Sequence, residues 1–286
     1  MKSDLVAASF AVLSLVCLAA GGAEAVPIAV ASAEIGADVS GVGTPDGEPF
    51  NLNMTVAFAG PPDSANTETA TVAGTPDGPR AGAQAVVQSV AGPARGLGAA
   101  LAGVTFTDAD TAADIPVAVA GFDGLPDPFV EVDAFPPSST ASAYVAAVAG
   151  VIATDVLEDV LDDFDTALDE VFDALPGGAF DLFDALSHVM ADLIADLMIG
   201  SVDAFACSEQ AFLRQPTGLP LGRCRTASLS ATFQPGTSLT VFTAVFATAR
   251  TDVASVPAPA TLALLGLGLA VLGAARRRRT AKPSRR

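Results

Sequence analysis

Two apolar runs, one near each end of the chain, limit the part of the sequence that can form a water-soluble core. The first covers Leu5 to Ala20, and the second covers Ala260 to Ala275 with Thr261 as its one polar residue. Both are shorter than the roughly 20 residues that a membrane-spanning helix needs. The body between the two ends, residues 26–255, has about 230 residues, enough for one large or two small domains.

The N-terminal run has the features of a secretory signal peptide. Lys2 precedes it, and Ala23 and Ala25 frame a small-residue A-x-A cleavage site directly after it. We therefore predict that residues 1–25 are removed between Ala25 and Val26. A retained N-terminal membrane helix is the alternative.

Prolines and arginines flank the C-terminal run. Pro257 and Pro259 precede it and break any helix at that point. The cluster Arg276–Arg279 follows it, and clustered arginines remain on the cytoplasmic side of a membrane. Since the signal peptide sends the body outward, both ends predict one orientation, with a single membrane span at about residues 257–275.

This order of elements resembles a PEP-CTERM sorting signal over residues 256–279. The resemblance implies that an exosortase, a membrane transpeptidase-like enzyme, recognises and removes the tail. It also implies an inner-membrane intermediate, a final place at the cell surface or outside the cell, and exopolysaccharide as a companion. Ala258 stands where the family usually has Glu, and a plain C-terminal membrane anchor is the alternative. The sorting residues are Val256, Pro257, Ala258, Pro259, Arg276, Arg277, Arg278 and Arg279.

The body is strongly acidic. It holds 30 of the 32 acidic residues against six arginines and no lysine, which leaves 24 net negative charges. Such a surface repels phosphate, so we expect no nucleic-acid partner. The chain also has no Trp and one tyrosine, Tyr144. This composition disfavours a sugar-binding face, which usually relies on stacking aromatics.

The first part of the body is predicted to be rich in strands. Residues 37–61 and 67–93 form a degenerate repeat, because Gly-Thr-Pro-Asp-Gly occurs at both Gly43–Gly47 and Gly74–Gly78. Pro-Asp-Gly suits a β-turn, so each copy is read as strand, turn, strand. Short strand candidates in residues 94–150 follow one another at a spacing of about 10 residues, which indicates a sandwich or jelly roll. The other predicted strands are Leu52–Phe58, Val104–Thr107, Ile115–Val119 and Phe129–Val132.

A change of hydrophobic period predicts an acidic helical hairpin. Over Val156–Leu175 the apolar residues share one helix face and the acidic residues the other. Pro176-Gly177-Gly178 ends this helix, and a second is predicted from about Ala179 to Ile199. The short link makes the helices antiparallel. We expect them to pack through Phe164, Leu168, Phe183 and Met190.

The last part of the body predicts a disulfide and a β-hairpin. Cys207 and Cys224 are the only cysteines left after signal removal, and an even pair in an exported protein indicates a disulfide. Two free thiols or a metal pair are the alternatives. Residues 228–233 and 238–248 alternate in polarity on either side of a Pro-Gly turn, which predicts a hairpin.

Two further groups of residues are candidate sites. Asp108, Asp110 and Asp114 form the best calcium candidate, since Ca²⁺ takes several oxygens from a turning loop. A solvated acidic turn is the alternative. His188, the only histidine, lies between Asp184 and Asp192 at helical spacing, and we read it as part of a solvated helix face. We identify no catalytic residue.

The predicted fold class is mixed α+β: a β-rich, sandwich-like body with an inserted acidic antiparallel helical hairpin, a signal peptide and a C-terminal membrane span. The body divides into a β-rich part (26–150), the hairpin (151–202) and the disulfide loop with a β-hairpin (203–255), ahead of the tail (256–286). We expect a non-catalytic, exported surface or matrix protein with no cofactor other than the candidate Ca²⁺. The alternatives are a secreted carboxylate-based hydrolase and a calcium-dependent adhesin or binding module.

Overall fold

The structure is a computed structural model, and part of the chain is described. The described residues are 27–39, 49–59, 63–72, 78–89, 92–107, 114–120, 129–133, 139–174, 179–212, 227–232 and 236–253. The predicted signal peptide, Cys224, Asp108, Asp110 and the sorting tail lie outside them. No helix in the described part is long and apolar enough to cross a membrane, and the predicted span at 257–275 lies beyond that part.

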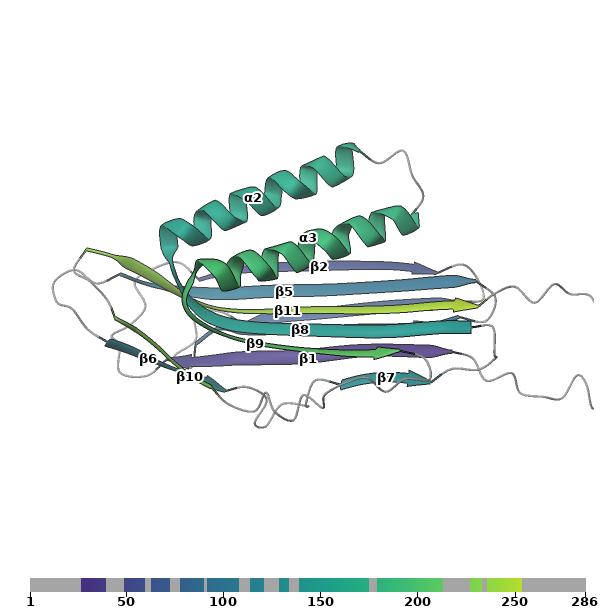
Figure 1. Cartoon of the computed structure of the whole chain (residues 1–286), viewed down its shortest axis with the longest axis horizontal. Coiled ribbons are helices and arrows are strands. Elements are labelled where there is room, and N and C mark those ends of the chain that lie inside the picture. Colours follow the sequence, from purple (N-terminus) through teal and green to yellow (C-terminus); the bar gives the residue numbers. More distant parts are fainter. Residues whose placement is uncertain are drawn as a thin grey trace, which may run out of the picture. The chain divides into compact units, whose positions relative to one another are not determined.

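The described chain forms strands, with two consecutive helices after the eighth strand (Figure 1). The helices are α2 (Thr154–Asp173) and α3 (Ala179–Gly200). The strands are β1 (Ile28–Val39), β2 (Phe50–Ala59), β3 (Ser64–Val72), β4 (Arg80–Gln88), β5 (Pro93–Thr107), β6 (Asp114–Ala120), β7 (Phe129–Asp133), β8 (Ser139–Ala153), β9 (Ser201–Phe212), β10 (Ala227–Thr232) and β11 (Ser238–Val253).

These strands form two antiparallel sheets. In the first sheet the order is β10-β6-β1-β4-β3, and β7 also pairs with β1. In the second sheet the order is β2-β5-β11-β8-β9. The long strand β11 pairs with β5 on one side, from Ser238↔Thr107 to Asp252↔Pro93, and with β8 on the other. The expectation of a β-rich fold with two helices is thus confirmed.

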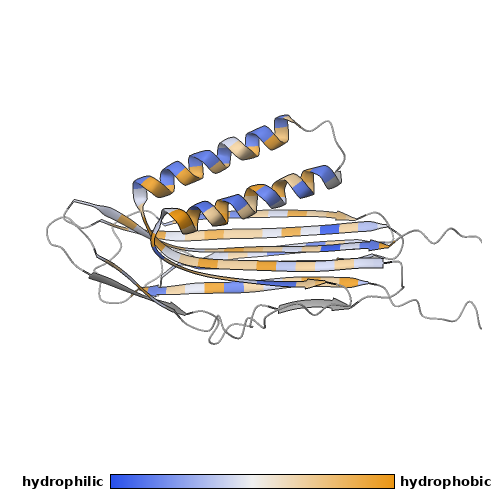
Figure 2. Cartoon of the chain, in the orientation of Figure 1, coloured by the Kyte–Doolittle hydropathy of each residue, from blue (hydrophilic) through white to orange (hydrophobic). Residues whose placement is uncertain are grey.

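The described part of the chain has three layers, with a buried core on each side of the second sheet. One core, the inter-sheet core, lies between the sheets. The other, the helix-side core, lies between the second sheet and the two helices. Both helices run along one face of that sheet, and each carries a hydrophobic and a hydrophilic stripe (Figures 1 and 2). The middle sheet is therefore covered on both faces, which explains why β5, β8 and β11 are apolar at successive positions.

The inter-sheet core is built mainly from small side chains. Most of its members are alanines, and the others are six valines, two leucines, Ile35, Phe106 and Cys207. At Gly98 of β5 an added Cβ would lie 3.0 Å from the backbone oxygen of Gln84 and 3.4 Å from that of Glu68, both in the opposite sheet. The backbones of the two sheets thus approach closely at this point, and a larger side chain there has no room.

The predicted hairpin of residues 228–233 and 238–248 is wrong in its pairing. Both segments are strands, but β10 pairs with β6 in the first sheet, while β11 lies in the centre of the second. The burial patterns give the reason. In β10, Leu229 and Ala231 are buried and their neighbours Ser228, Ser230 and Thr232 are exposed, which suits a sheet with one covered face. In contrast, β11 is buried at successive positions and needs covers on both faces.

The two copies of the degenerate repeat form the expected strands with different partners. In the second copy, β3 and β4 pair with each other as a hairpin, and Gly78 has φ +97° at its turn. In the first copy, β1 joins the first sheet and β2 the second. The predicted strands at Val104–Thr107, Ile115–Val119 and Phe129–Val132 are confirmed as parts of β5, β6 and β7.

The helical hairpin is confirmed within two residues at each end. Phe164, Phe183 and Met190 are buried in the helix-side core, and Leu168 packs against it. The acidic residues of α2 lie on its exposed side. The helical periodicity thus places the polar side chains in water and the apolar side chains on the sheet.

The close approach of the sheets predicts that Gly98 tolerates no branched side chain. Gly98→Val should lower the free energy of unfolding by about 3 kcal/mol, because the new methyl groups would press on the backbone of β4. Thermal or urea unfolding measures the change. Ala70→Val, which adds carbon on the exposed face of β3, serves as the control and should change stability little. Equal effects of the two variants would contradict close sheet packing at Gly98.

A second prediction concerns a buried hydroxyl in β11. Thr243 is 0 % exposed, and its Oγ1 has no hydrogen-bond partner among the described residues. Thr243→Val should therefore raise the free energy of unfolding by about 1 kcal/mol, since it removes an unpaired polar atom without changing shape. The matched control is Thr240→Val on the same strand. Its hydroxyl lies 3.0 Å from that of Thr105 and 3.1 Å from that of Thr154, so this change should destabilise.

Candidate binding pocket between α3 and the second sheet

The helix-side face of the second sheet changes from apolar to polar towards the C-terminal end of β11. Two neighbouring cross-strand rows carry the change. In one row Arg250 is opposite Ser142, which is opposite Phe212; in the next, Thr248 is opposite Tyr144, which is opposite Gln210. Alternation along the strands places these six side chains on the same face as Phe246, part of the helix-side core.

A pocket of about 370 Å³ opens over these two rows, and we call it the α3 pocket. Strands β8, β9 and β11 supply its floor and α3 supplies one wall. It has a polar and an aromatic part, and none of the described residues that line it is acidic. The lining residues are Ser142, Ala143, Tyr144, Ser187, His188, Ala191, Gln210, Phe212, Phe246, Thr248 and Arg250.

Tyr144 is held at the floor of the pocket by its neighbours. Its ring meets that of Phe246 edge to face, with centroids 6.0 Å apart and an angle of 63° between the planes. Burial raises the pKa of the Tyr144 hydroxyl, and a hydrogen bond with the Ser208 side chain partly offsets this. The phenol is therefore neutral at physiological pH, and its hydroxyl group is already oriented by a hydrogen bond.

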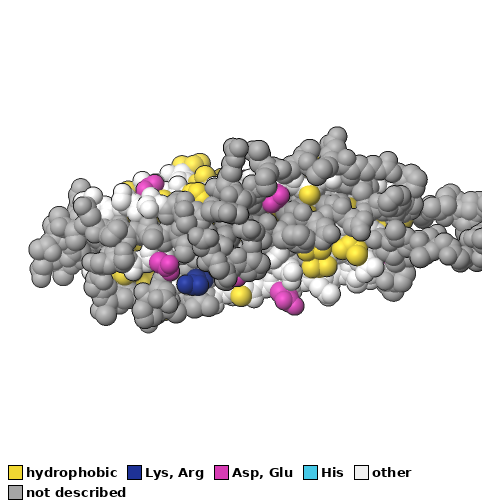
Figure 3. Space-filling view, turned by 90° about the horizontal axis from the view of Figure 1, so that it is seen from below, with side chains coloured by type: hydrophobic (Ala, Val, Ile, Leu, Met, Phe, Trp, Pro, Cys, Tyr) yellow, Lys and Arg dark blue, Asp and Glu magenta, His cyan; other side chains and the backbone are white. Residues whose placement is uncertain are grey.

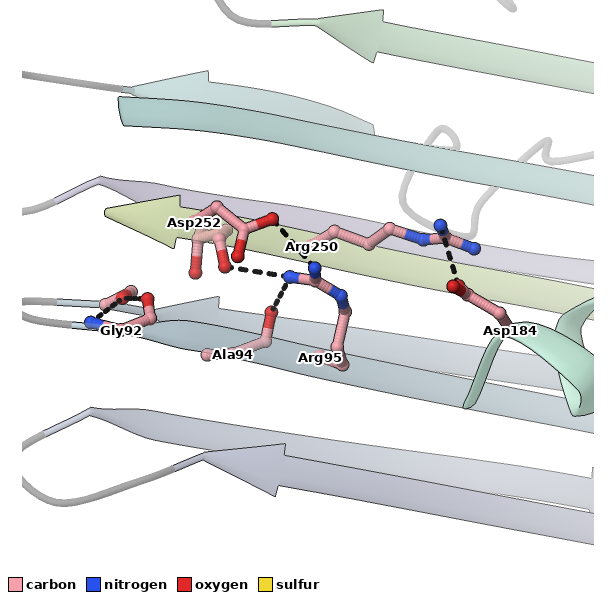
Figure 4. A network of polar contacts seen from close by, with 8 residues as sticks. Gly92, Ala94, Arg95, Asp184, Arg250 and Asp252 are labelled. Atoms are coloured by element: carbon pink, nitrogen blue, oxygen red, sulfur yellow. Dashed lines mark hydrogen bonds and ion pairs between the residues drawn. The ribbon is translucent and has the colours of Figure 1, made fainter. Parts of the chain in front are cut away.

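Arg250 lies at the edge of the pocket with its charge compensated. Its Nη1 is 2.9 Å from Oδ1 of Asp184 on α3, and its guanidinium lies over the Phe183 ring, 4.9 Å from the centroid. The ion pair (Figure 4) and the cation–π contact tie α3 to the sheet. Because about half of each side chain is in solvent, the pair fixes geometry more than it adds stability.

A second arginine lies beside Arg250 on the neighbouring strand and has its own carboxylate. Arg95 is directly opposite Arg250 in the register. Its Nη2 donates to Oδ2 of Asp252 at 2.7 Å, and its Nη1 donates to the backbone oxygen of Thr251 at 2.9 Å (Figure 4). Two adjacent cations would repel each other, but each is paired with one acid, so this end of the sheet carries little net charge.

His188 lies at the α3 pocket, which its sequence context did not predict. Its side chain is exposed, as expected of a solvated helix face. However, it also lines the pocket, and Asp184, one turn away, pairs with Arg250. Alternation in the segment 238–248 puts Thr248 on the same face of the strand as Phe246. The missing information was that β8 and β9 are strands that bring Tyr144 and Gln210 to that face.

The calcium candidate is only partly within the described chain. Asp108 and Asp110 lie outside it, and Asp114 begins β6 without a described side chain. No group of three or more His, Cys, Asp or Glu side chains that could hold a metal occurs among the described residues. On the outer face of the first sheet, the visible acidic side chains stand apart from one another (Figure 3).

Cys207 on β9 is 8 % exposed and is disulfide-bonded. The other end of this bond lies outside the described part of the chain, so the pairing with Cys224 stays a prediction. Cys207 is opposite Ala147 of β8 and belongs to the inter-sheet core.

Comparison with known proteins identifies a sorting motif in the C-terminal tail. No curated protein and no solved structure matches the chain significantly. The family model of the PEP-CTERM protein-sorting motif matches residues 255–279. The C-terminal tail of this chain therefore carries a PEP-CTERM protein-sorting motif, at the residues where the resemblance was found.

Proposed function

We propose that this chain is an exported cell-surface or extracellular-matrix protein with a non-catalytic body, sorted through its C-terminal tail. The observation that carries the proposal is the PEP-CTERM motif at residues 255–279. This motif is typical of exported proteins that an exosortase, a membrane enzyme, processes. The predicted signal peptide at residues 1–25 supplies the export step that such a tail requires.

The order of residues in the motif suggests how the tail works. The apolar run from Ala260 to Ala275, if helical, rises about 24 Å, which is short of a hydrocarbon core of about 30 Å. It is therefore a weak permanent anchor, but sufficient for a transient one. Arg276–Arg279 hold the far end of the apolar run in the cytoplasm. Pro257 and Pro259 keep the Val-Pro-x-Pro box, residues 256–259, out of a helix. The box is thus presented to the enzyme at a fixed depth.

The chemistry of the α3 pocket supports a binding role for the body. Carboxylate-based glycoside hydrolysis needs two facing carboxyl groups about 5–10 Å apart. The described lining of the pocket instead holds hydroxyl, amide, imidazole and guanidinium groups. Asp184, one turn before the lining residue His188, forms an ion pair with Arg250 at 2.9 Å. This arrangement favours recognition of a ligand over its cleavage.

Intact mass spectrometry of protein extracted from the envelope tests the proposal. We expect a mature form that starts at Val26, ends near the Val-Pro-x-Pro box and has the mass deficit of one disulfide. Replacing Pro257 and Pro259 with Ala should yield a membrane-bound form that keeps Arg286, because the box no longer stays extended. Replacing Arg276–Arg279 with Ser should release unprocessed protein, because nothing holds the far end in the cytoplasm.

The matched control replaces Arg285 and Arg286 with Ser, since both lie outside the residues that the motif model matches. This variant should be processed like the wild type. If the wild type keeps its tail at steady state and the proline variant has the same mass, the tail is a plain anchor. A mature protein that starts at Met1 would contradict the predicted signal peptide.

A further inference from the structure

We propose that the α3 pocket binds a neutral sugar residue, either a free monosaccharide or one unit of a longer glycan. The pocket combines two surfaces that different parts of a sugar ring match. Tyr144 and Phe212 offer aromatic carbon to the C–H faces of the ring, and the buried Phe246 supports Tyr144 from below. The polar groups match its hydroxyls, and they belong to Ser142, Ser187, His188, Gln210, Thr248 and Arg250.

Both surfaces must be satisfied at once, which excludes simpler ligands. A purely apolar ligand would remove the polar side chains from water without pairing them, and each such loss costs about 1–3 kcal/mol. A small inorganic ion would leave the aromatic rings uncovered. A polyhydroxylated ring presents hydroxyl groups around its rim and carbon on its faces, so it pairs the first surface and covers the second.

The charges select a neutral ligand over an acidic one. Arg250 is the one fixed cation among the described lining residues, and Asp184 compensates it at 2.9 Å. The adjacent Arg95 is likewise paired, with Asp252 at 2.7 Å. The body as a whole carries 24 net negative charges, which disfavours the approach of an anion. A phosphate or uronate would have to break one of these ion pairs to gain a counter-charge.

The polar groups are held in place before any ligand arrives. Three strands supply the floor in fixed register, with Tyr144 opposite both Thr248 and Gln210. Ser187 donates to the backbone oxygen of Phe183 at 2.8 Å, which leaves its oxygen free to accept. The Arg250–Asp184 pair holds α3 against the sheet. A preorganised set of donors and acceptors lowers the entropy cost of binding.

The volume and the opening of the pocket fit one sugar ring and leave room for the sugar units joined to it. A volume of about 370 Å³ lies at the lower end of the range of small-molecule sites. Phe212, at the C-terminal end of β9, is 42 % exposed and forms a rim that a second sugar unit can contact. The single tyrosine of the chain thus lies where aromatic stacking is needed, although the overall composition is poor in such residues.

Saturation-transfer-difference NMR on the purified full chain tests the proposal. The probes are the methyl glycosides of glucose, galactose, mannose and N-acetylglucosamine, with glucuronate and inorganic phosphate as acidic comparisons. We expect transfer from protein to the ring C–H protons of at least one neutral glycoside. Gln210→Ala, at an exposed position, and Thr248→Val, at a buried one, should each weaken its binding about tenfold. Tyr144→Leu should abolish it.

Asp196→Asn, on an exposed position of α3 outside the pocket lining, is the control and should bind like the wild type. Melting temperatures show which variants are folded, and Gln210→Ala decides the outcome if the two changes at more buried positions unfold the chain. The proposal is overturned if no neutral glycoside gives transfer, if Gln210→Ala binds normally, or if only glucuronate or phosphate binds. Because the assay reads ligand binding and not mass, its failure is distinct from a failure of sorting.

Discussion

The close approach of the two sheets is the constraint on which the rest of the structure depends. Gly98 lies so near the backbone of β4 that even a Cβ would be tight, and the core between the sheets is mostly alanine. Each alanine buries little apolar area, so this core alone gives a modest hydrophobic stabilisation. The helices add a second core with Phe, Leu and Met on the other face of the middle sheet. The stability of the body thus depends on both layers together.

Covering the middle sheet on both faces also determines where a pocket forms. Along β11 the helix-side residues are large and apolar at Phe242 and Phe246, then polar at Thr248 and Arg250. At Arg250 the sheet meets α3 through an ion pair and a cation–π contact. The α3 pocket lies beside this contact, between α3 and the polar end of β11.

Local periodicity was sufficient to predict the helices but only some of the strands. The two-faced pattern of Val156–Leu175 located α2, and alternation located β2 and β10. Strands β8 and β9 were missed, and only the last residues of β5 were found. From Val145 on, β8 is Ala-rich and buried on both sides, so no polar residue marks an outward face there, and alanine itself favours a helix. The partners of β10 and β11 depend on which strands have two covered faces, a property of the assembled layers.

The position of β11 has a mechanical consequence for a protein that is held by its C-terminus. This strand ends at Val253, two residues before the matched motif begins, and its neighbours β5 and β8 flank it along nearly its whole length. A pull on the tail along the strand would load both hydrogen-bonded ladders in shear, so many bonds would have to break together. A terminal strand at a sheet edge would instead peel away one bond at a time. While the tail is still attached, a load on it would therefore act on a central strand that is paired on both sides.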